Sequence, residues 1–215
     1  KQVGKNGYLL FLTADHGGTH TPNTQKAHKL PGGCWDSGVA MKRVNETLSA
    51  KYGIEGKYIK DIIGSGIYLD HELISSNKLC LDKVKADAIA ELQKDKELMA
   101  VVDCEKATVA PIPQWIRERI VNGYYRGRTG DLYAVVKTNH FEWNVKDDFY
   151  GSSHGIWSPA DTHIPLVFMG WNVKHGKTNR RTLMVDTAPT VCAMLHLQMP
   201  DGCIGNPIVE VADQQ

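Results

Sequence analysis

Several features that would mark particular classes of protein are missing from these 215 residues. Twenty-five basic side chains nearly balance 24 acidic ones, and the net charge of +1 gives no electrostatic reason to expect a nucleic-acid-binding surface. No apolar run approaches the roughly 20 residues needed to cross a bilayer, so we expect no membrane span. Residues 1–5 are polar and do not form a signal-peptide core.

Common phosphate-binding and metal-finger motifs are missing as well. The chain contains neither Gly-x-x-x-x-Gly-Lys-Ser/Thr nor Gly-x-Gly-x-x-Gly, which argues against nucleotide-binding folds of those types. The five cysteines are scattered, include no Cys-x-x-Cys, and leave at least one thiol unpaired in a monomer. Ser152 and Ser153 do not lie in Gly-x-Ser-x-Gly, so a serine nucleophile has little support.

What is present is the composition of an ordinary globular protein. Hydrophobic residues make up 42% and charged residues 23% of the chain, and its length allows one sizeable core. A single domain over residues 1–215 is therefore the simplest expectation.

The most informative stretch runs from Tyr8 to Gly18. Tyr8–Leu12 are five consecutive apolar residues, typical of a strand buried on both faces in the middle of a parallel sheet. Asp15 and His16 follow closely, at the kind of strand end where open α/β sheets bind ligands. Carboxylate oxygen and imidazole nitrogen are good ligands for a divalent metal such as Zn²⁺. Alternatively, Asp15 caps a turn and His16 is an ordinary surface side chain.

A second candidate histidine lies far along the chain. His154 is flanked by Gly151-Ser152-Ser153 and Gly155, and a loop then leads into the apolar segment 164–169. Flanking glycines permit a close approach of the backbone to a site. His163, directly before Ile164-Pro165, is a rival to His154 as the ligand, and otherwise it either contacts the ligands from behind or is an ordinary histidine of the loop.

The intervening segments predict mixed helices and strands. Residues 17–37, which carry His20, are rich in Gly, Pro, Thr and Asn and predict a long irregular loop. Apolar residues at helical spacing predict helices over 37–52, 81–92 and 113–121, and we expect the charged side of the second to face solvent. Shorter apolar runs predict strands at 58–63, 67–69, 98–102 and 133–136.

Taken together and in this order, the motifs resemble the alkaline phosphatase superfamily. Thr13-Ala-Asp-His-Gly-Gly, the later Gly-Ser-Ser-His-Gly and Asp161-Thr-His-Ile-Pro carry the resemblance, and the segments 186–190 and 199–202 agree with it. The likeness is greatest to bacterial phosphatases of the phosphate-irrepressible type, grouped with the type I phosphodiesterase/nucleotide pyrophosphatase branch. It spans the chain from Tyr8 to about Val211 and covers only the C-terminal portion of such enzymes.

The resemblance implies a fold and a set of ligands. The fold would be α/β, a mostly parallel sheet with helices on both faces, with residues 55–110 as a small α+β insert. Each enzyme of this kind holds two zinc ions, although other divalent metals are possible. By likeness of motif, Asp15 and His16 would bind one ion and His154 the other. The nucleophile and the remaining three ligands would lie upstream, outside this sequence.

The resemblance also implies an activity. The parent protein would be a metal-dependent phosphoric ester hydrolase, first of all a phosphomonoesterase acting on small phosphate esters. A phosphodiesterase, nucleotide pyrophosphatase, sulfatase or phosphomutase of the same superfamily is the alternative, and a non-catalytic metal-binding fragment is another. By resemblance alone the protein would be periplasmic or otherwise exported, and no oligomeric state is implied.

Three expectations follow for this chain. Asp15, His16 and His154 should converge in space, because the two ions of such a site lie only about 4 Å apart. The chain alone should have no significant phosphatase activity. It should bind Zn²⁺ weakly, if at all, since a catalytic zinc has three protein ligands, unless His20 or His163 swings in to complete a site.

Overall fold

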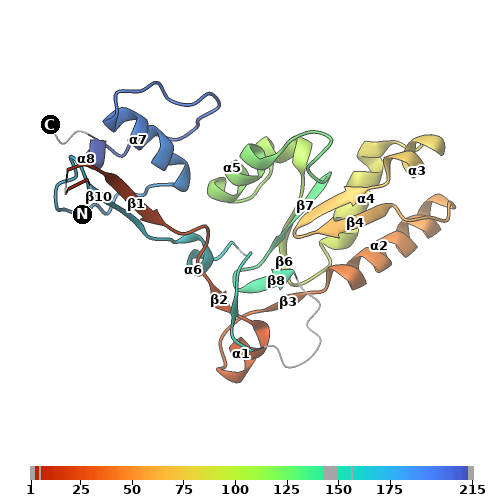
Figure 1. The fold of residues 1–215 in the computed structure, drawn as a ribbon. Helices are drawn as coiled ribbons and strands as arrows, with labels where there is room; N and C mark the ends of the chain where they lie inside the picture. Colours follow the sequence, from red (N-terminus) through yellow and green to blue (C-terminus); the bar gives the residue numbers. More distant parts are fainter. Residues whose placement is uncertain (1–2, 5, 143–149, 156, 213–215) are drawn as a thin grey trace. The chain divides into compact units, whose positions relative to one another are not determined.

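The computed structural model describes residues 3–4, 6–142, 150–155 and 157–212. Helices and strands are mixed throughout, which confirms the expected α/β class. The chain divides into two units, Lys1–Asp15 with Ile164–Gln215, and His16–His163 (Figure 1). No helix of the described residues is both long and apolar enough to cross a bilayer. All five cysteines lie within the described part and are free thiols.

The larger unit, His16–His163, is built on a four-stranded sheet. Its strands are β4 (Ile59–Ile63), β5 (Gly66–Leu69), β7 (Leu132–Val136) and β6 (Leu98–Asp103), in that spatial order. Every neighbouring pair is antiparallel. The sequence predicts all four strands. The two-residue Gly64-Ser65 turn closes a hairpin between the first two, because Gly64 adopts the positive φ of +59° that tight hairpin turns use. Whether residues 55–110 form an insert stays a prediction.

Helices cover both faces of this sheet (Figure 1). On one side lie α2 (Ser37–Tyr52) and α4 (Leu81–Leu92), and on the other η1 (Cys104–Val109) and α5 (Gln114–Gly123). Val44 and Leu48 of α2 and Val84 of α4 are fully or almost fully buried, as their spacing along each helix predicts. Each side chain of this size contributes roughly 1.5–3 kcal/mol on burial. Ile116 anchors α5 to the opposite face.

The charged side of α4 is not wholly solvated, contrary to expectation. Lys85 is 2% exposed, and its ammonium donates to Glu105 at 2.9 Å and to Asp103 at 3.3 Å. Lys85 lies beside the buried apolar face of α4, and carboxylates from η1 and the end of β6 contact its ammonium group. Burial alone would lower the pKa of Lys85, but the two carboxylates raise it above its usual value. The same hydrogen bond lowers the pKa of Glu105.

Residues 17–37 do not form the irregular loop that their composition predicts. They contain β2 (Thr19–His20), α1 (Pro22–Ala27) and β3 (Gly33–Trp35). The strands pair with β9 (Ser152–Ser153) and β8 (His140–Glu142), more than 100 residues further along the chain. Such short strands carry no periodic signal, because their stability depends on these distant partners. The unit is completed by α3 (His71–Ser76) and α6 (Pro159–Thr162).

The smaller unit, Lys1–Asp15 with Ile164–Gln215, contains a two-stranded ribbon. In it β1 (Leu9–Thr13) pairs antiparallel with β10 (Leu166–Gly170). The expectation that Tyr8–Leu12 is buried on both faces of a parallel sheet is wrong for this chain. Leu10, Phe11 and Leu12 are 43%, 46% and 58% exposed, because β10 is the only strand beside β1 among the described residues. Within that described part β3–β8 is the parallel pair, and the other pairs are antiparallel.

The rest of the smaller unit comprises η2 (Met184–Asp186), α7 (Thr187–Met194) and α8 (Val209–Ala212). The buried carboxylate of Asp186 connects these elements through hydrogen bonds. Asp186 accepts hydrogen bonds from the amides of Leu183 at 2.7 Å and Asn206 at 2.9 Å. Thr190 donates to the main-chain oxygen of Asp186 and accepts from the amide of Ile208. These bonds fix the loop between α7 and α8 to the start of α7.

Candidate metal centre

The structure brings His16 and His154 into direct contact although 138 residues separate them. Their imidazole rings are stacked, with centroids 3.7 Å apart and planes inclined by 12°. Both histidines belong to the larger unit, and both are exposed. The predicted convergence requires these two side chains to lie within one site, and their ring contact meets that requirement.

The backbone beside His16 assigns its tautomer. The Nδ1 atom lies 2.7 Å from the main-chain oxygen of Gly17. A carbonyl oxygen can only accept, so Nδ1 is the donor in this contact, and in the neutral imidazole the lone pair is then on Nε2. A histidine that donates through one ring nitrogen and coordinates through the other is the usual arrangement at metal sites. In that tautomer Nε2 is the ring nitrogen of His16 that can coordinate a cation.

Asp15 precedes His16 directly, is exposed, and ends the first segment of the smaller unit, Lys1–Asp15. It lies two residues beyond Thr13, where β1 ends. The sequence places a carboxylate and an imidazole next to each other at a strand end, and the structure keeps that local order.

The two other candidates are placed differently. His20 lies in β2, paired with Ser152 of β9, and is exposed. His163 follows α6 directly, with its amide bonded to the Pro159 oxygen at 2.8 Å, and is also exposed. Of the two rivals His154 and His163, it is His154 whose ring lies against that of His16.

The donor types fit a divalent metal, but their number falls short. Imidazole nitrogen and carboxylate oxygen suit Zn²⁺ and similar ions. The described residues, however, contain no group of three or more His, Cys, Asp or Glu side chains placed to hold one ion.

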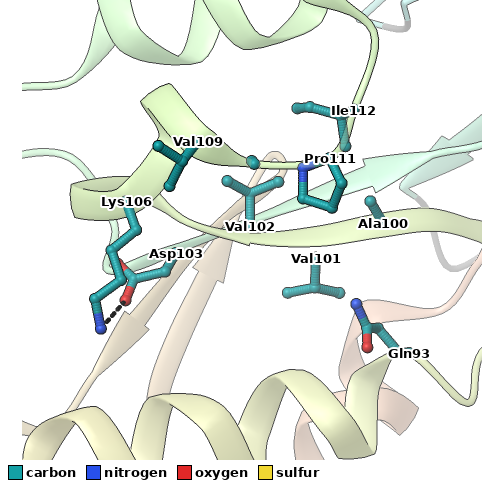
Figure 2. Close-up of a pocket in the computed structure, with 10 residues that line it drawn as sticks. Gln93, Ala100, Val101, Val102, Asp103, Lys106, Val109, Pro111 and Ile112 are labelled. Carbon is teal, nitrogen blue, oxygen red and sulfur yellow. Dashed lines mark ion pairs between the residues drawn. The ribbon is translucent and has the colours of Figure 1, made fainter.

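A pocket elsewhere in the larger unit is a poor alternative site. It has a volume of about 260 Å³ and lies between β6, the end of α4 and the segment that follows η1 (Figure 2). Figure 2 shows mostly apolar side chains around it, including Val101, Val102 and Pro111. The charges at its edge are already paired, since the Lys106 ammonium lies 2.9 Å from Asp82 and 3.7 Å from Asp103. None of the predicted site residues lines it.

Sequence reasoning missed the residues that hold the two histidine loops in place. Asp161 is buried and accepts a hydrogen bond from the amide of Gly155. Trp157 packs edge-on against Trp115 and Tyr133, which attaches the His154 loop to α5 and β7. Ser158-Pro159 is a recognisable helix start and could have predicted α6. No sequence signal predicts which backbone groups that helix would bind.

Comparison with solved structures shows that this chain has the fold of part of an alkaline phosphatase. The crystal structure of wild-type alkaline phosphatase PafA matches with a TM-score of 0.89 and 36% identity, covering 98% of this chain and 39% of that one. A variant of the same enzyme matches with a TM-score of 0.87. No protein-family model matches the sequence.

Curated relatives agree. Alkaline phosphatase PafA of Elizabethkingia meningoseptica is 36% identical over 211 residues, and alkaline phosphatase PhoV of Synechococcus elongatus is 38% identical over 213. A Myroides odoratus protein named calcium-transporting ATPase is 39% identical over 214 residues. Between 98% and 100% of this chain aligns, but only 37–38% of each relative. Over nearly its whole length the chain is similar to alkaline phosphatases, and it spans somewhat over a third of the length of these relatives.

Proposed function

We propose that this chain is the C-terminal portion of a two-metal phosphohydrolase, and that the whole protein is an alkaline phosphatase acting on phosphate monoesters. The observation that carries the proposal is the ring contact of His16 with His154 in a chain 36–38% identical to named alkaline phosphatases. Asp15 and His16 would hold one ion and His154 the other. The nucleophile and the other three ligands would come from an upstream portion.

The chemistry of the site follows from these donors. Two divalent ions held side by side clamp the attacking and leaving oxygens of a phosphate ester and neutralise its charge. In this proposal, the residues of this chain orient the atoms that would bind the metal ions. His16 is oriented by its Nδ1–H bond to Gly17 and offers Nε2. Two histidines and a carboxylate favour zinc, although other divalent ions accept the same donors.

The exposed apolar side chains of the smaller unit support the proposal that the chain is a portion of a larger fold. Five on the ribbon are at least 43% exposed: Leu10, Phe11, Leu12, Val167 and Met169. A two-stranded ribbon is marginally stable alone in water, and a sheet normally covers such faces. In the whole protein, upstream strands and helices would cover them. By family resemblance we place the whole protein in the periplasm or outside the cell.

The similarity to two proteins named alkaline phosphatases favours a monoesterase over the phosphodiesterase, sulfatase or phosphomutase alternatives. The test is to express the longer protein that contains this segment and to assay it with p-nitrophenyl phosphate and with its bis-ester. We expect monoester turnover to fall at least about 100-fold in His16→Ala and His154→Ala, since effective catalysis needs the ions held together. His175→Asn, at an exposed position outside the site, is the matched control. Diester turnover exceeding monoester turnover would contradict the proposed substrate class, and full activity of both site variants would contradict the site.

A further inference from the structure

One buried residue lies between the loops that carry His16 and His154. Asp161, in the short helix α6, is 4% exposed. Its Oδ2 accepts a hydrogen bond from the amide of Gly155 at 2.6 Å, and its main-chain oxygen accepts one from the amide of Gly17 at 2.7 Å. Gly155 directly follows His154, and Gly17 directly follows His16. Asp161 therefore holds the backbone beside each histidine.

The His16 loop lies tightly against α6. Besides the Gly17 bond, the amide of Gly18 donates to the oxygen of Ala160 at 3.1 Å. A Cβ atom on Gly17 would lie 2.2 Å from that same oxygen, so only glycine permits this approach. On the other side Gly155 has φ +95°, a conformation that also favours glycine. The glycines that flank the two histidines are thus required by contact with α6 and by the turn after His154.

The ring contact between the histidines is too weak to bring these loops together by itself. An aromatic pair contributes about 0.5–1.5 kcal/mol beyond the area it buries. A hydrogen bond to a charged group contributes about 1.5–3 kcal/mol, and a buried carboxylate left without donors is costly. The bonds to Asp161 and Ala160 are therefore the stronger constraint on the spacing of the two imidazoles.

We propose that Asp161 is a positioning residue, which sets His16 and His154 at the spacing that two neighbouring divalent ions require. The carboxylate fixes the His154 loop and the main-chain oxygen fixes the His16 loop. The link to metal rests on the proposed function, whereas the positioning itself does not. Groups that orient metal ligands in this way typically change metal affinity 10–100-fold when removed.

The positioning is tested first without metal, by NMR on the full chain. We expect the amide of Gly155 to be protected from hydrogen exchange and the ring protons of His16 and His154 to show mutual nuclear Overhauser effects. In Asp161→Ala both signals are lost. Ser158→Ala is the control, because it removes the side-chain cap of α6, whose Oγ accepts from the Ala160 amide at 3.2 Å, and leaves Asp161 intact. Loss of both signals in Ser158→Ala, or their retention in Asp161→Ala, overturns the proposal.

The metal link is tested by Zn²⁺ titration calorimetry on the same variants. Asp161→Ala should bind Zn²⁺ at least about 10-fold more weakly than the wild type. Asp161→Asn keeps an acceptor oxygen, so its Zn²⁺ affinity should lie between those of the wild type and Asp161→Ala. This variant also provides a test if Asp161→Ala does not fold. Equal affinity in all three overturns the metal link. If the wild type gives no Zn²⁺ response while Asp161→Ala still loses the ring contact, the metal link is overturned and the positioning role stands, whereas the proposed function is decided by the turnover of the longer protein.

Discussion

At the scale of the residue, Gly17 and Gly18 look alike in the sequence and differ in the structure. A Cβ on Gly17 meets the Ala160 oxygen at 2.2 Å, whereas the nearest atom to a Cβ on Gly18 is the Ser153 oxygen at 3.7 Å, an ordinary contact. Gly17→Ala should lower the free energy of unfolding by about 2 kcal/mol, because the loop must move away from α6. Gly18→Ala should change it by less than about 0.5 kcal/mol. Urea denaturation of both variants measures this, and equal losses would contradict the close approach.

The single residues of the site show what a sequence can and cannot indicate. His154 could be chosen because glycines flank it, and His16 because it follows an apolar run and an aspartate. Asp161 could not be chosen in the same way. Its role depends on two backbone amides, Gly17 and Gly155, which any residue possesses and which only the folded chain brings to it. A side chain that acts on the backbone of distant residues leaves no pattern in one sequence.

At the scale of the element, α4 carries a buried cation whose removal should be costly. Lys85→Met keeps the volume of the side chain but leaves Asp103 and Glu105 without their shared partner. We expect a loss of about 3 kcal/mol in the free energy of unfolding, the lower end for breaking a buried ion pair. Lys83→Met, at an exposed position of the same helix, is the control and should cost less than about 0.5 kcal/mol. Similar losses in both variants would mean that Lys85 is not buried among carboxylates.

The same contact should make this stabilisation depend on pH in a defined direction. Folding lowers the pKa of Glu105 from its usual 4.5, so its contribution is present above that pH and is lost as the pH falls through the lower folded value. Folding raises the pKa of Lys85 from its usual 10.5, so its contribution is complete below that pH and is lost as the pH rises through the higher value. The difference in stability between wild type and Lys85→Met should therefore be level between about pH 5 and 10. A difference that grows on acidification below pH 4.5 would contradict this sign.

Elements with strong local periodicity could be predicted, and elements made by distant pairing could not. The helices α2 and α4 and the hairpin β4–β5 lie where apolar spacing and the Gly64-Ser65 turn place them. The strands β2 and β3 were missed because two or three residues carry no period and their partners are distant. For β1 the apolar run predicted a strand, but burial is a property of the neighbours, and within the described residues β10 is the neighbour that it has.

At the scale of the whole molecule, we expect that this chain alone does not hydrolyse phosphate esters. Its described residues contain no group of three side chains able to hold one ion, and the nucleophile is proposed to lie upstream. With p-nitrophenyl phosphate and excess Zn²⁺, the purified chain should give no turnover above the metal-catalysed background. Turnover that His16→Ala abolishes would show that the chain contains a complete site.

Histidine-selective NMR during a Zn²⁺ titration shows whether His16 and His154 bind metal. The chain has nine histidines, each of which reports separately through its imidazole nitrogens. We expect the Nε2 resonance of His16 and a ring nitrogen of His154 to shift first and at the same Zn²⁺ concentration, with Nδ1 of His16 remaining protonated. A response at His163 or His20 that leaves His16 and His154 unshifted would show that the proposed ligands are wrong.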